Sequence, residues 1–250
     1  MTVVTSELIR RIPKAELHCH LDGSVRPSTL LDLARDQRKS LPRDDADALR
    51  EYMRVDDARN LEEYLERFAV TLSVMQQAEA MERIAYELAE DCAQEGVRYL
   101  ETRFAPILNV REGLTGAQAL EAALRGLARA ERAFGITSRV IVCAIRNMPP
   151  TASLEAAWLA VDFKGDGVVG FDLAGGEIGN PADLHAHAFD HCRQHGLPCT
   201  CHAGEGDGAS SIAAAMHACH AHRIGHGTHL IDDPALMLAA KEAGVAIECC

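Results

Sequence analysis

Strand-like and helix-like segments alternate along this 250-residue chain, and this alternation restricts its fold more than any other feature. Apolar or β-branched runs have the pattern of strands; they lie at 15–20, 97–104, 136–145, 167–173, 197–202, 222–225 and 245–248. Segments with helical spacing lie between them, at 27–38, 61–75, 79–94, 116–134, 153–163, 181–195, 210–221 and 234–243. A polar segment, 39–59, follows the first helix. The alternation predicts an α/β fold with a parallel sheet and crossover helices.

The number of units narrows the choice of parallel fold. A (β/α)8 barrel of the TIM type is typical of a chain of this length, and the 48% hydrophobic content is ample for its core. Such a barrel needs eight strands, whereas the seventh predicted strand lies directly before the end of the sequence at Cys250. We therefore expect a single domain, residues 1–250, whose eighth strand and C-terminal helices are absent from this sequence. An open sheet is the alternative.

Charge and cysteine usage exclude several classes of function. The 25 basic and 37 acidic residues give a formal net charge of −12, which argues against nucleic-acid or anionic-membrane partners. No run approaches the ~18 apolar residues of a membrane span, and the charged stretch 1–16 lacks the apolar segment of a secretory signal. The nine cysteines form no C-x-x-C pair. We therefore expect reduced thiols and a cytoplasmic protein.

Polar residues gather where the predicted strands end. In a parallel barrel the carboxyl ends of the strands converge on one mouth, where catalysis is built. The residues at these ends are His18 and His20 on the first strand, Gly175 and Glu177 after the fourth, His202 and Glu205 on the fifth, and His226 on the sixth. We expect them to share one site.

The histidines in this group have the pattern of metal ligands. His18 and His20 are two residues apart, so on a strand they face the same side, and His202 ends another strand. Neutral imidazoles bind zinc, and Glu205, three residues after His202, can move protons for whatever the metal activates. The alternative for the His-x-His pair alone is two satisfied core histidines. Cys19 and Cys201 adjoin the histidines but should point to the opposite faces of their strands.

Other histidines and one apolar stripe allow simpler interpretations. His187, His191 and His195 recur every four residues, which predicts a solvated helix face rather than a surface metal clamp. We also expect the group at 217, 220 and 222 to lie on the surface, and His229 remains unassigned. The stripe on segment 61–75 is either core packing or an apolar wall over the site; it consists of Leu61, Tyr64, Leu65, Phe68 and Leu72.

Several familiar motifs do not fit. The cytidine-deaminase pattern requires H-x-E followed by P-C-x-x-C, whereas here the order is His-Ala-Gly-Glu and the segment Pro198 to Cys201 precedes it with another spacing. The metalloprotease pattern H-E-x-x-H is absent from the sequence. The glycine-rich stretch 204–208 lacks the Lys-Ser/Thr pair of a phosphate-binding loop.

Four motifs together resemble the adenosine deaminase family, a branch of the metal-dependent amidohydrolases that includes adenosine, AMP and adenine deaminases. They are Pro-Lys-Ala-Glu-Leu-His-Cys-His-Leu-Asp-Gly at 13–23, Asp-Leu-Ala-Gly at 172–175, His-Ala-Gly-Glu at 202–205 and Arg-Ile-Gly-His-Gly at 223–227. Their order matches that of the family, and their combination is specific. The resemblance implies that residues 1–250 form one metal-dependent deaminase barrel, incomplete at its C-terminus.

The resemblance also implies a set of roles. His18, His20 and His202 would bind one Zn²⁺ per chain. Glu205 would protonate the purine ring nitrogen, and His226 would position the attacking water, which zinc makes acidic enough to react near pH ~7. The residues implied at the substrate are His20, Asp22 at the ribose, Gly175 through its backbone, and Tyr64 and Phe68 on an apolar lid helix.

The implied reaction is hydrolytic deamination of adenosine or 2′-deoxyadenosine to the inosine form and ammonia, a step of purine salvage. Adenine or another 6-aminopurine is the alternative substrate. A family member that only binds, and does not catalyse, is the alternative of another class. The expected partner is therefore a small purine nucleoside, with no nucleic acid and no membrane; the oligomeric state is not specified by the sequence.

Two features depart from the family pattern. Gly176 stands where the family usually has an aspartate that contacts the purine. The family's last zinc ligand and its neighbour are two aspartates on the eighth strand, and this sequence does not contain them. We expect a protein that ends at Cys250 to be poor in metal, inactive and prone to aggregate.

Overall fold

A computed structural model describes residues 4–56 and 58–250 of the chain. Residues 1–3 and 57, which belong to the charged stretch 1–16 and the polar segment 39–59, lie outside the described residues. No helix in the described ranges is both long and apolar enough to cross a membrane.

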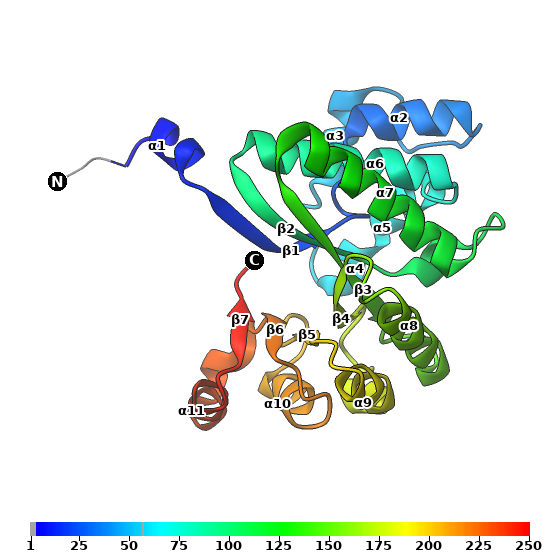
Figure 1. Cartoon of the computed structure of the whole chain (residues 1–250). Coiled ribbons are helices and arrows are strands. Elements are labelled where there is room, and N and C mark those ends of the chain that lie inside the picture. Colours follow the sequence, from blue (N-terminus) through cyan, green and yellow to red (C-terminus); the bar gives the residue numbers. More distant parts are fainter. Residues whose placement is uncertain (1–3, 57) are drawn as a thin grey trace.

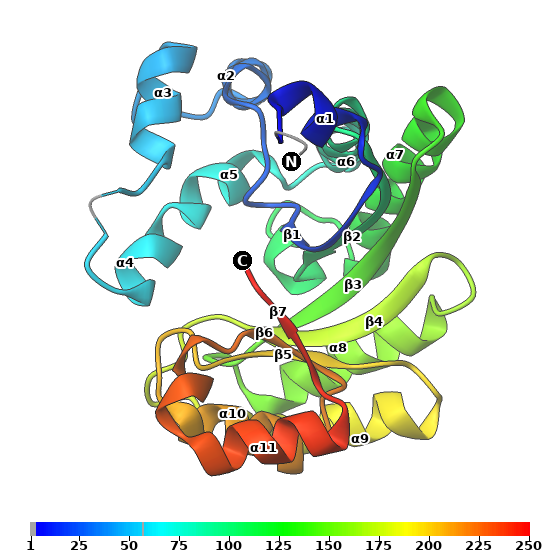
Figure 2. The same ribbon diagram turned by 90° about the vertical axis from the view of Figure 1, so that its left-hand side faces the viewer.

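The strands within residues 4–56 and 58–250 are all parallel and follow one another in space in chain order. They are β1 (Lys14–His20), β2 (Val97–Phe104), β3 (Thr137–Ile145), β4 (Val168–Ala174), β5 (Thr200–Ala203), β6 (Arg223–His226) and β7 (Ala246–Glu248). The first four form one sheet and the last three another. A bridge between Phe171 of β4 and Cys199 joins the two sheets. The result is the predicted α/β class, with one continuous curved run of strands (Figures 1 and 2).

Except for the first helix, which precedes β1, the helices lie in the connections between successive strands. They are α1 (Ser6–Arg11), α2 (Pro27–Asp36), α3 (Ala46–Met53), α4 (Leu61–Glu66), α5 (Phe68–Val74), α6 (Ala78–Gln94), α7 (Gly116–Phe134), α8 (Pro150–Asp162), α9 (Ala186–Gln194), α10 (Ala209–His217) and α11 (Pro234–Ala243). Helices α6 to α11 cover the outer side of the strands (Figure 1). Short 3₁₀ helices lie at Pro106–Asn109, Ala182–His185 and Thr228–Asp232. This is the arrangement of an incomplete (β/α)8 barrel.

The core lies between the strands and the outer helices. Leu100 of β2, Val140 of β3 and Ile224 of β6 are fully buried. Strands buried on both faces are expected to be mainly apolar, and the buried middle of β3, Val140–Ala144, has this composition, whereas β2 carries several polar and charged residues. Helices α6 and α7 approach closely at Gly126, where an added Cβ would lie 2.2 Å from the backbone oxygen of Glu82. A side chain at this position would push the two helices apart.

The segment between β1 and α6 differs from the prediction. The expected helix 61–75 is two helices, α4 and α5, because the N–H of Arg67 bonds to the carbonyl of Tyr64 three residues earlier and interrupts the α-helical ladder. The polar segment 39–59 contains α3, which begins at an Asp45 cap and buries Leu49. Figure 2 shows α2 to α5 as a group at one side of the strands. The first turn of the expected helix 181–195 is 3₁₀.

Candidate metal and catalytic site

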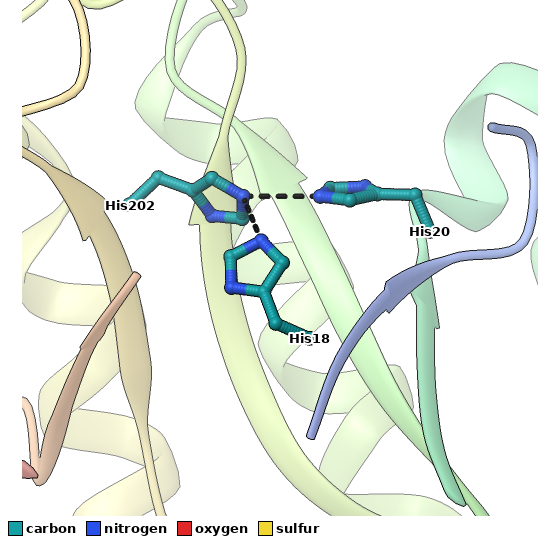
Figure 3. A group of neighbouring side chains, drawn as sticks. All are labelled: His18, His20 and His202. Atoms are coloured by element: carbon teal, nitrogen blue, oxygen red, sulfur yellow. Dashed lines mark hydrogen bonds between the residues drawn. The ribbon is translucent and has the colours of Figure 1, made fainter. Parts of the chain in front are cut away.

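Three histidines from two distant strands meet at the carboxyl ends of the sheet. His18 and His20 project from the same side of β1 toward His202 of β5 (Figure 3). The Nε2 atom of His202 lies 3.1 Å from Nε2 of His18 and 3.1 Å from Nε2 of His20. The ligand atoms of the three rings all lie within 4.8 Å of one another. The structure thus brings together the three histidines that the sequence pattern selected.

Carboxylates fix two of these rings from behind. Nδ1 of His18 lies 2.8 Å from Oε2 of Glu248, and Nδ1 of His202 lies 3.0 Å from Oδ2 of Asp172. Because an ionised carboxylate only accepts hydrogen bonds, each Nδ1 carries the proton and each Nε2 keeps a lone pair. The facing Nε2 atoms of His18 and His202 are therefore both acceptors.

This donor set fits a divalent metal. Two acceptor nitrogens 3.1 Å apart repel each other unless a cation lies between them. Ligands ~2.0–2.1 Å from a tetrahedral metal are ~3.3 Å apart, close to the separation seen here. Burial lowers the pKa of His18 and lowers that of His20 well below its usual value, which favours the neutral, ligating form of both rings. The three rings are therefore a candidate metal site.

A buried arginine links the two supporting carboxylates. Arg103 of β2 is fully buried and lies 3.1 Å from Asp172 and 2.8 Å from Glu248, which also pairs with Arg223 of β6. Burial alone would raise the pKa of Asp172, but His202 and Arg103 hold it well below its usual value. Histidine ligands commonly donate their second N–H to a carboxylate in this way, which fixes the ring orientation.

Sequence analysis missed Arg103, Glu248 and the supporting role of Asp172. Asp172 and Glu248 are charged residues within otherwise apolar strands, and Arg103 is a charged residue at a buried position of β2. That signal was available, because a charge in a doubly buried strand needs a partner. The pairing of β2, β4 and β7 residues with one another was not available from the sequence.

Glu205 and His226 face each other beside the histidine cluster. Nε2 of His226 lies 3.4 Å from Oε1 of Glu205. Burial raises the pKa of Glu205 and lowers that of His226 to about 4. Near neutral pH the imidazole is therefore neutral, and the carboxyl keeps its proton to higher pH than a free glutamate. His226 is also close enough to His18 and Cys250 for the three to form a second group of potential metal ligands.

A cavity of about 990 Å³ opens over these groups. Its lining contains the candidate substrate contacts Asp22, Gly175, Gly176, Tyr64 and Phe68, together with His18, His20, His202, Glu205 and His226. Oδ1 of Asp22 is buried without a hydrogen-bond partner, and burial raises the pKa of this residue to about 6. Such a group is suited to a polar ligand atom.

The apolar stripe of segment 61–75 forms a wall of this cavity. Leu61, Tyr64, Leu65, Phe68 and Leu72 all line it. The ring centroid of Phe68 lies 6.2 Å from that of His20 and 5.7 Å from that of Tyr64. Leu72 is also buried. Both interpretations of the stripe therefore hold: Leu72 of α5 is a buried core residue, whereas the stripe residues of α4 line the cavity without being buried.

The remaining histidines lie away from the cavity. His187 and His195 are exposed and His191 is half-buried, as expected for a solvated face of α9. His217, His220 and His222 are exposed as well. His229 pairs with Asp232 at 2.8 Å. Buried His185, which the sequence analysis did not single out, bonds to the Ser153 hydroxyl at 2.7 Å and to the carbonyl of Arg146, after β3, at 3.1 Å.

Comparison with known proteins adds to this geometry. A sequence model of the family described as adenosine deaminase matches residues 13–250. The chain belongs to the adenosine deaminase family. It is 46% identical over 241 residues to an adenosine deaminase of Mycobacteroides abscessus. The match covers 92% of this chain and 66% of that protein. It is 41% identical over 248 residues to a probable adenosine deaminase of Dictyostelium discoideum, covering 99% of this chain and 32% of that protein. The chain thus spans 32% to 66% of the length of these relatives.

Solved structures of adenosine deaminase relatives share the fold. An amidohydrolase from Burkholderia ambifaria with bound Zn aligns with a TM-score of 0.88 and 29% identity, covering 100% of this chain and 68% of that one. An adenine deaminase from Arthrobacter aurescens aligns with a TM-score of 0.83 and 27% identity, and the alignment covers 94% of this chain and 71% of that one. Arabidopsis ADAL complexed with IMP aligns with a TM-score of 0.83 and 28% identity, and the alignment covers 98% of this chain and 72% of that one. These likenesses confirm the TIM-barrel type of amidohydrolase fold.

Proposed function

We propose that this chain carries the metal-binding and acid–base residues of a hydrolase that converts adenosine or 2′-deoxyadenosine to inosine or 2′-deoxyinosine and ammonia. The observation that carries the proposal is the convergence of three histidine Nε2 atoms beside Glu205 and His226 in one cavity. Relatives at 41–46% identity bear the name adenosine deaminase, which supports the substrate class.

His18, His20 and His202 would hold the metal, which we propose to be one Zn²⁺, the ion bound in the Burkholderia relative. When bound, the ion supplies Lewis acidity that makes a water molecule nucleophilic near neutral pH. Glu248 and Asp172 keep the first and third of these rings in the ligating tautomer. The two carboxylates and Arg103 thereby orient the metal ligands.

Glu205 and His226 would divide the proton transfers. Adding a water oxygen to C6 of the purine would push electron density onto the neighbouring ring nitrogen, and the protonated carboxyl of Glu205 would donate a proton there. The bond from C6 to the exocyclic nitrogen would then break; of the two water protons, one would leave with the amine as ammonia and the other would restore the Glu205 carboxyl. The neutral imidazole of His226 would accept a hydrogen bond from the attacking water and hold it in place. A well-placed acid of this kind accelerates a reaction by ~10²–10⁴-fold.

The wall of the cavity would bind the nucleoside. Asp22, with its unpartnered buried oxygen, would accept a ribose hydroxyl. The backbone of Gly175 would contact the purine, and Tyr64 and Phe68 would cover it. His20 would face both the metal and the substrate.

The proposal also includes a cell compartment, argued from the cysteines, and a partner. We place the protein in the cytoplasm, where reduced thiols persist; its nine cysteines are free, and five of them are fully or almost fully buried. The partner is a small purine nucleoside.

The test supplies zinc to the purified protein and adds one candidate substrate at a time. Ammonia release is measured for adenosine, 2′-deoxyadenosine, adenine and AMP. Ammonia from the two nucleosides at rates well above the other two compounds supports the proposal. Preference for adenine would assign the activity of the Arthrobacter relative instead. Nucleoside binding in calorimetry without ammonia from any substrate would leave a binding protein.

A further inference from the structure

Glu177, three residues after the end of β4, is a buried acidic residue with no part in the chemistry assigned above. Its side chain is almost completely shielded from solvent. Its carboxylate accepts four backbone hydrogen bonds, from Gly204 at 2.7 Å, Glu205 at 3.0 Å, Gly206 at 2.6 Å and Asp207 at 3.0 Å. The Ser211 hydroxyl at the start of α10 donates to it as well.

These bonds fix the segment that carries Glu205. Residues 204–207 connect β5 to α10, and four consecutive N–H groups of this segment point at one carboxylate. On the other side, the carbonyl of Gly204 accepts hydrogen bonds from the Thr228 hydroxyl and from the N–H of His229, after β6. Gly204 itself has a left-handed φ of +66°, and an added Cβ there would lie 2.5 Å from Ile212. The segment is thus held from both neighbouring strands.

The side chain of Glu205 has weaker contacts than its backbone. Its partner among the side chains described is His226, at 3.4 Å. The position of its carboxyl therefore depends chiefly on how firmly the backbone at 204–207 is held. A displacement of ~1 Å in a reacting group can cost ~10²-fold in rate.

The charge of Glu177 strengthens this hold. Burial alone would raise the pKa of Glu177, but the hydrogen bonds from Ser211 and from the backbone N–H groups of Gly206 and Gly204 lower it. The carboxylate is therefore ionised, and hydrogen bonds to an ionised acceptor are about twice as strong as neutral ones. Gly175, which lines the cavity, lies two residues earlier on the same turn. One short segment after β4 thus contacts both the cavity and the Glu205 loop.

We propose that Glu177 is a positioning residue for deamination: by binding the backbone of residues 204–207, it sets the place of the Glu205 carboxyl relative to the purine. The inference rests on the proposed function. Glu177 itself does not touch the reacting atoms. Its effect falls on turnover rather than on metal or substrate binding.

The test compares Glu177→Gln with Glu155→Gln, which makes the same charge change at an exposed site on α8. The amide keeps the shape of the side chain but presents an N–H₂ group to the N–H of Gly204. We expect kcat to fall by ~10–10²-fold with little change in KM, with metal content and Tm close to those of the parent. Hydrogen exchange of the amides at 204–207 should accelerate. The Glu155→Gln variant should match the parent in all five measurements.

A second variant keeps the test decisive if Glu177→Gln does not fold. Ser211→Ala removes one donor from the same carboxylate and leaves its charge; we expect a smaller loss of kcat at constant KM, with faster exchange at 204–207. Parent-like kcat in the folded variants would overturn the inference, as would loss of kcat only in step with metal or Tm. If the parent protein releases no ammonia, the proposed function fails instead, and the exchange data alone report whether Glu177 holds the loop.

Discussion

At the scale of single residues, the cavity places two titratable groups side by side whose pKa values are moved in opposite directions. Burial disfavours the charged form of each, which raises the pKa of Glu205 and lowers that of His226. A carboxyl that keeps its proton to higher pH than a free glutamate, beside an imidazole that is uncharged near neutral pH, suits an acid paired with a hydrogen-bond acceptor. Pairs with separated pKa values of this kind are a common sign of divided acid–base roles.

The first prediction concerns Glu205→Gln. The amide retains the size and hydrogen bonding of the side chain but cannot deliver a proton, so kcat should fall by ~10²–10⁴-fold while nucleoside binding persists. The parent should lose activity as pH rises through the raised pKa of Glu205, because the acid is then ionised, and this alkaline limb should vanish in the variant. Steady-state kinetics over pH measure both effects. Glu62→Gln, on the exposed face of α4, is the control; kcat within a few fold of the parent in Glu205→Gln would remove this residue from the acid role.

The second prediction concerns His226→Ala. Because the three histidines of the cluster are the proposed metal ligands and His226 is not among them, the variant should lose turnover by at least ~10²-fold and keep its metal. Elemental analysis and kinetics on one preparation measure the two quantities together. His217→Ala, at an exposed position of α10, should change neither. Loss of the metal from His226→Ala would instead identify this residue as a ligand, as its proximity to His18 and Cys250 would allow.

At the scale of secondary structure elements, the helices differ sharply in how they are held. Helices α6 and α7 are in close backbone contact, with several residues of each fully buried. Helix α4 has no buried residue within Leu61–Glu66, although three of its side chains line the cavity. Elements with few buried contacts open at low free-energy cost. The stable helices therefore support the strands, and α4 is the element suited to move when a ligand enters.

The third prediction tests the close approach of α6 and α7. Gly126→Ala adds a Cβ 2.2 Å from the carbonyl oxygen of Glu82 and 3.0 Å from the Cβ of Ala85, so the helices must separate. The overpacking should cost ~1–3 kcal/mol, more than the gain of ~1 kcal/mol in helix propensity. Thermal unfolding should show a lower Tm. Gly165→Ala, where the added atom meets nothing within 4 Å, is the matched control; an equal or higher Tm for Gly126→Ala would contradict the packing described.

The fourth prediction tests the mobility of α4. The Asn60 side chain caps this helix by accepting a hydrogen bond from the N–H of Glu63 at 2.9 Å. Asn60→Ala should destabilise α4 by ~1 kcal/mol, which raises KM for the nucleoside while leaving the global Tm nearly unchanged. Hydrogen exchange of residues 62–66, together with KM, measures this. Asp45→Ala removes the equivalent cap of α3, away from the cavity, and should leave KM unaltered. A fall in global Tm with constant KM would show that α4 is part of the cooperative core.

At the scale of the whole molecule, the metal site joins the two sheets. His18 and His20 belong to the sheet β1–β4, whereas His202 belongs to β5–β7 and lies 184 residues beyond His18 in the chain. Between the two sheets, the described backbone forms one isolated β-bridge, which pairs Phe171 with Cys199. A bound ion would therefore connect parts of the fold that share few backbone bonds.

The fifth prediction follows from that position. Since the histidines converge only in the folded state, zinc at ~100 times its Kd should stabilise the protein by ~2.7 kcal/mol and raise Tm by roughly 5–10 °C. Thermal scans with zinc and with a chelator measure the shift. His20→Ala should abolish most of it, whereas His195→Ala, on the exposed face of α9, should retain it. An equal shift in both variants would place the ion elsewhere.

The sequence alone determined the strands, most of the helices and the three histidines of the cluster. Periodicity and glycine caps are local properties, so Val97–Phe104 and Gly116–Phe134 have the bounds expected from them. His18 and His20 are two residues apart on a strand, which puts them on one face whatever surrounds them. The break at Arg67 and the short helix α3 escaped prediction because weak local preferences there are decided by neighbouring elements.

Only the tertiary structure decided which charged residues support the rings of those histidines. Asp172, Arg103 and Glu248 lie on three strands, separated by up to 145 residues between Arg103 and Glu248, and nothing local in the sequence pairs them. The same holds for Glu177, whose partners lie 27–34 residues further along the chain. A buried charge must find its counter-charge or donors through the fold, because no solvent is there to satisfy it. The spacing of residues thus selected the chemistry of the site, and packing across strands determined how that chemistry is held.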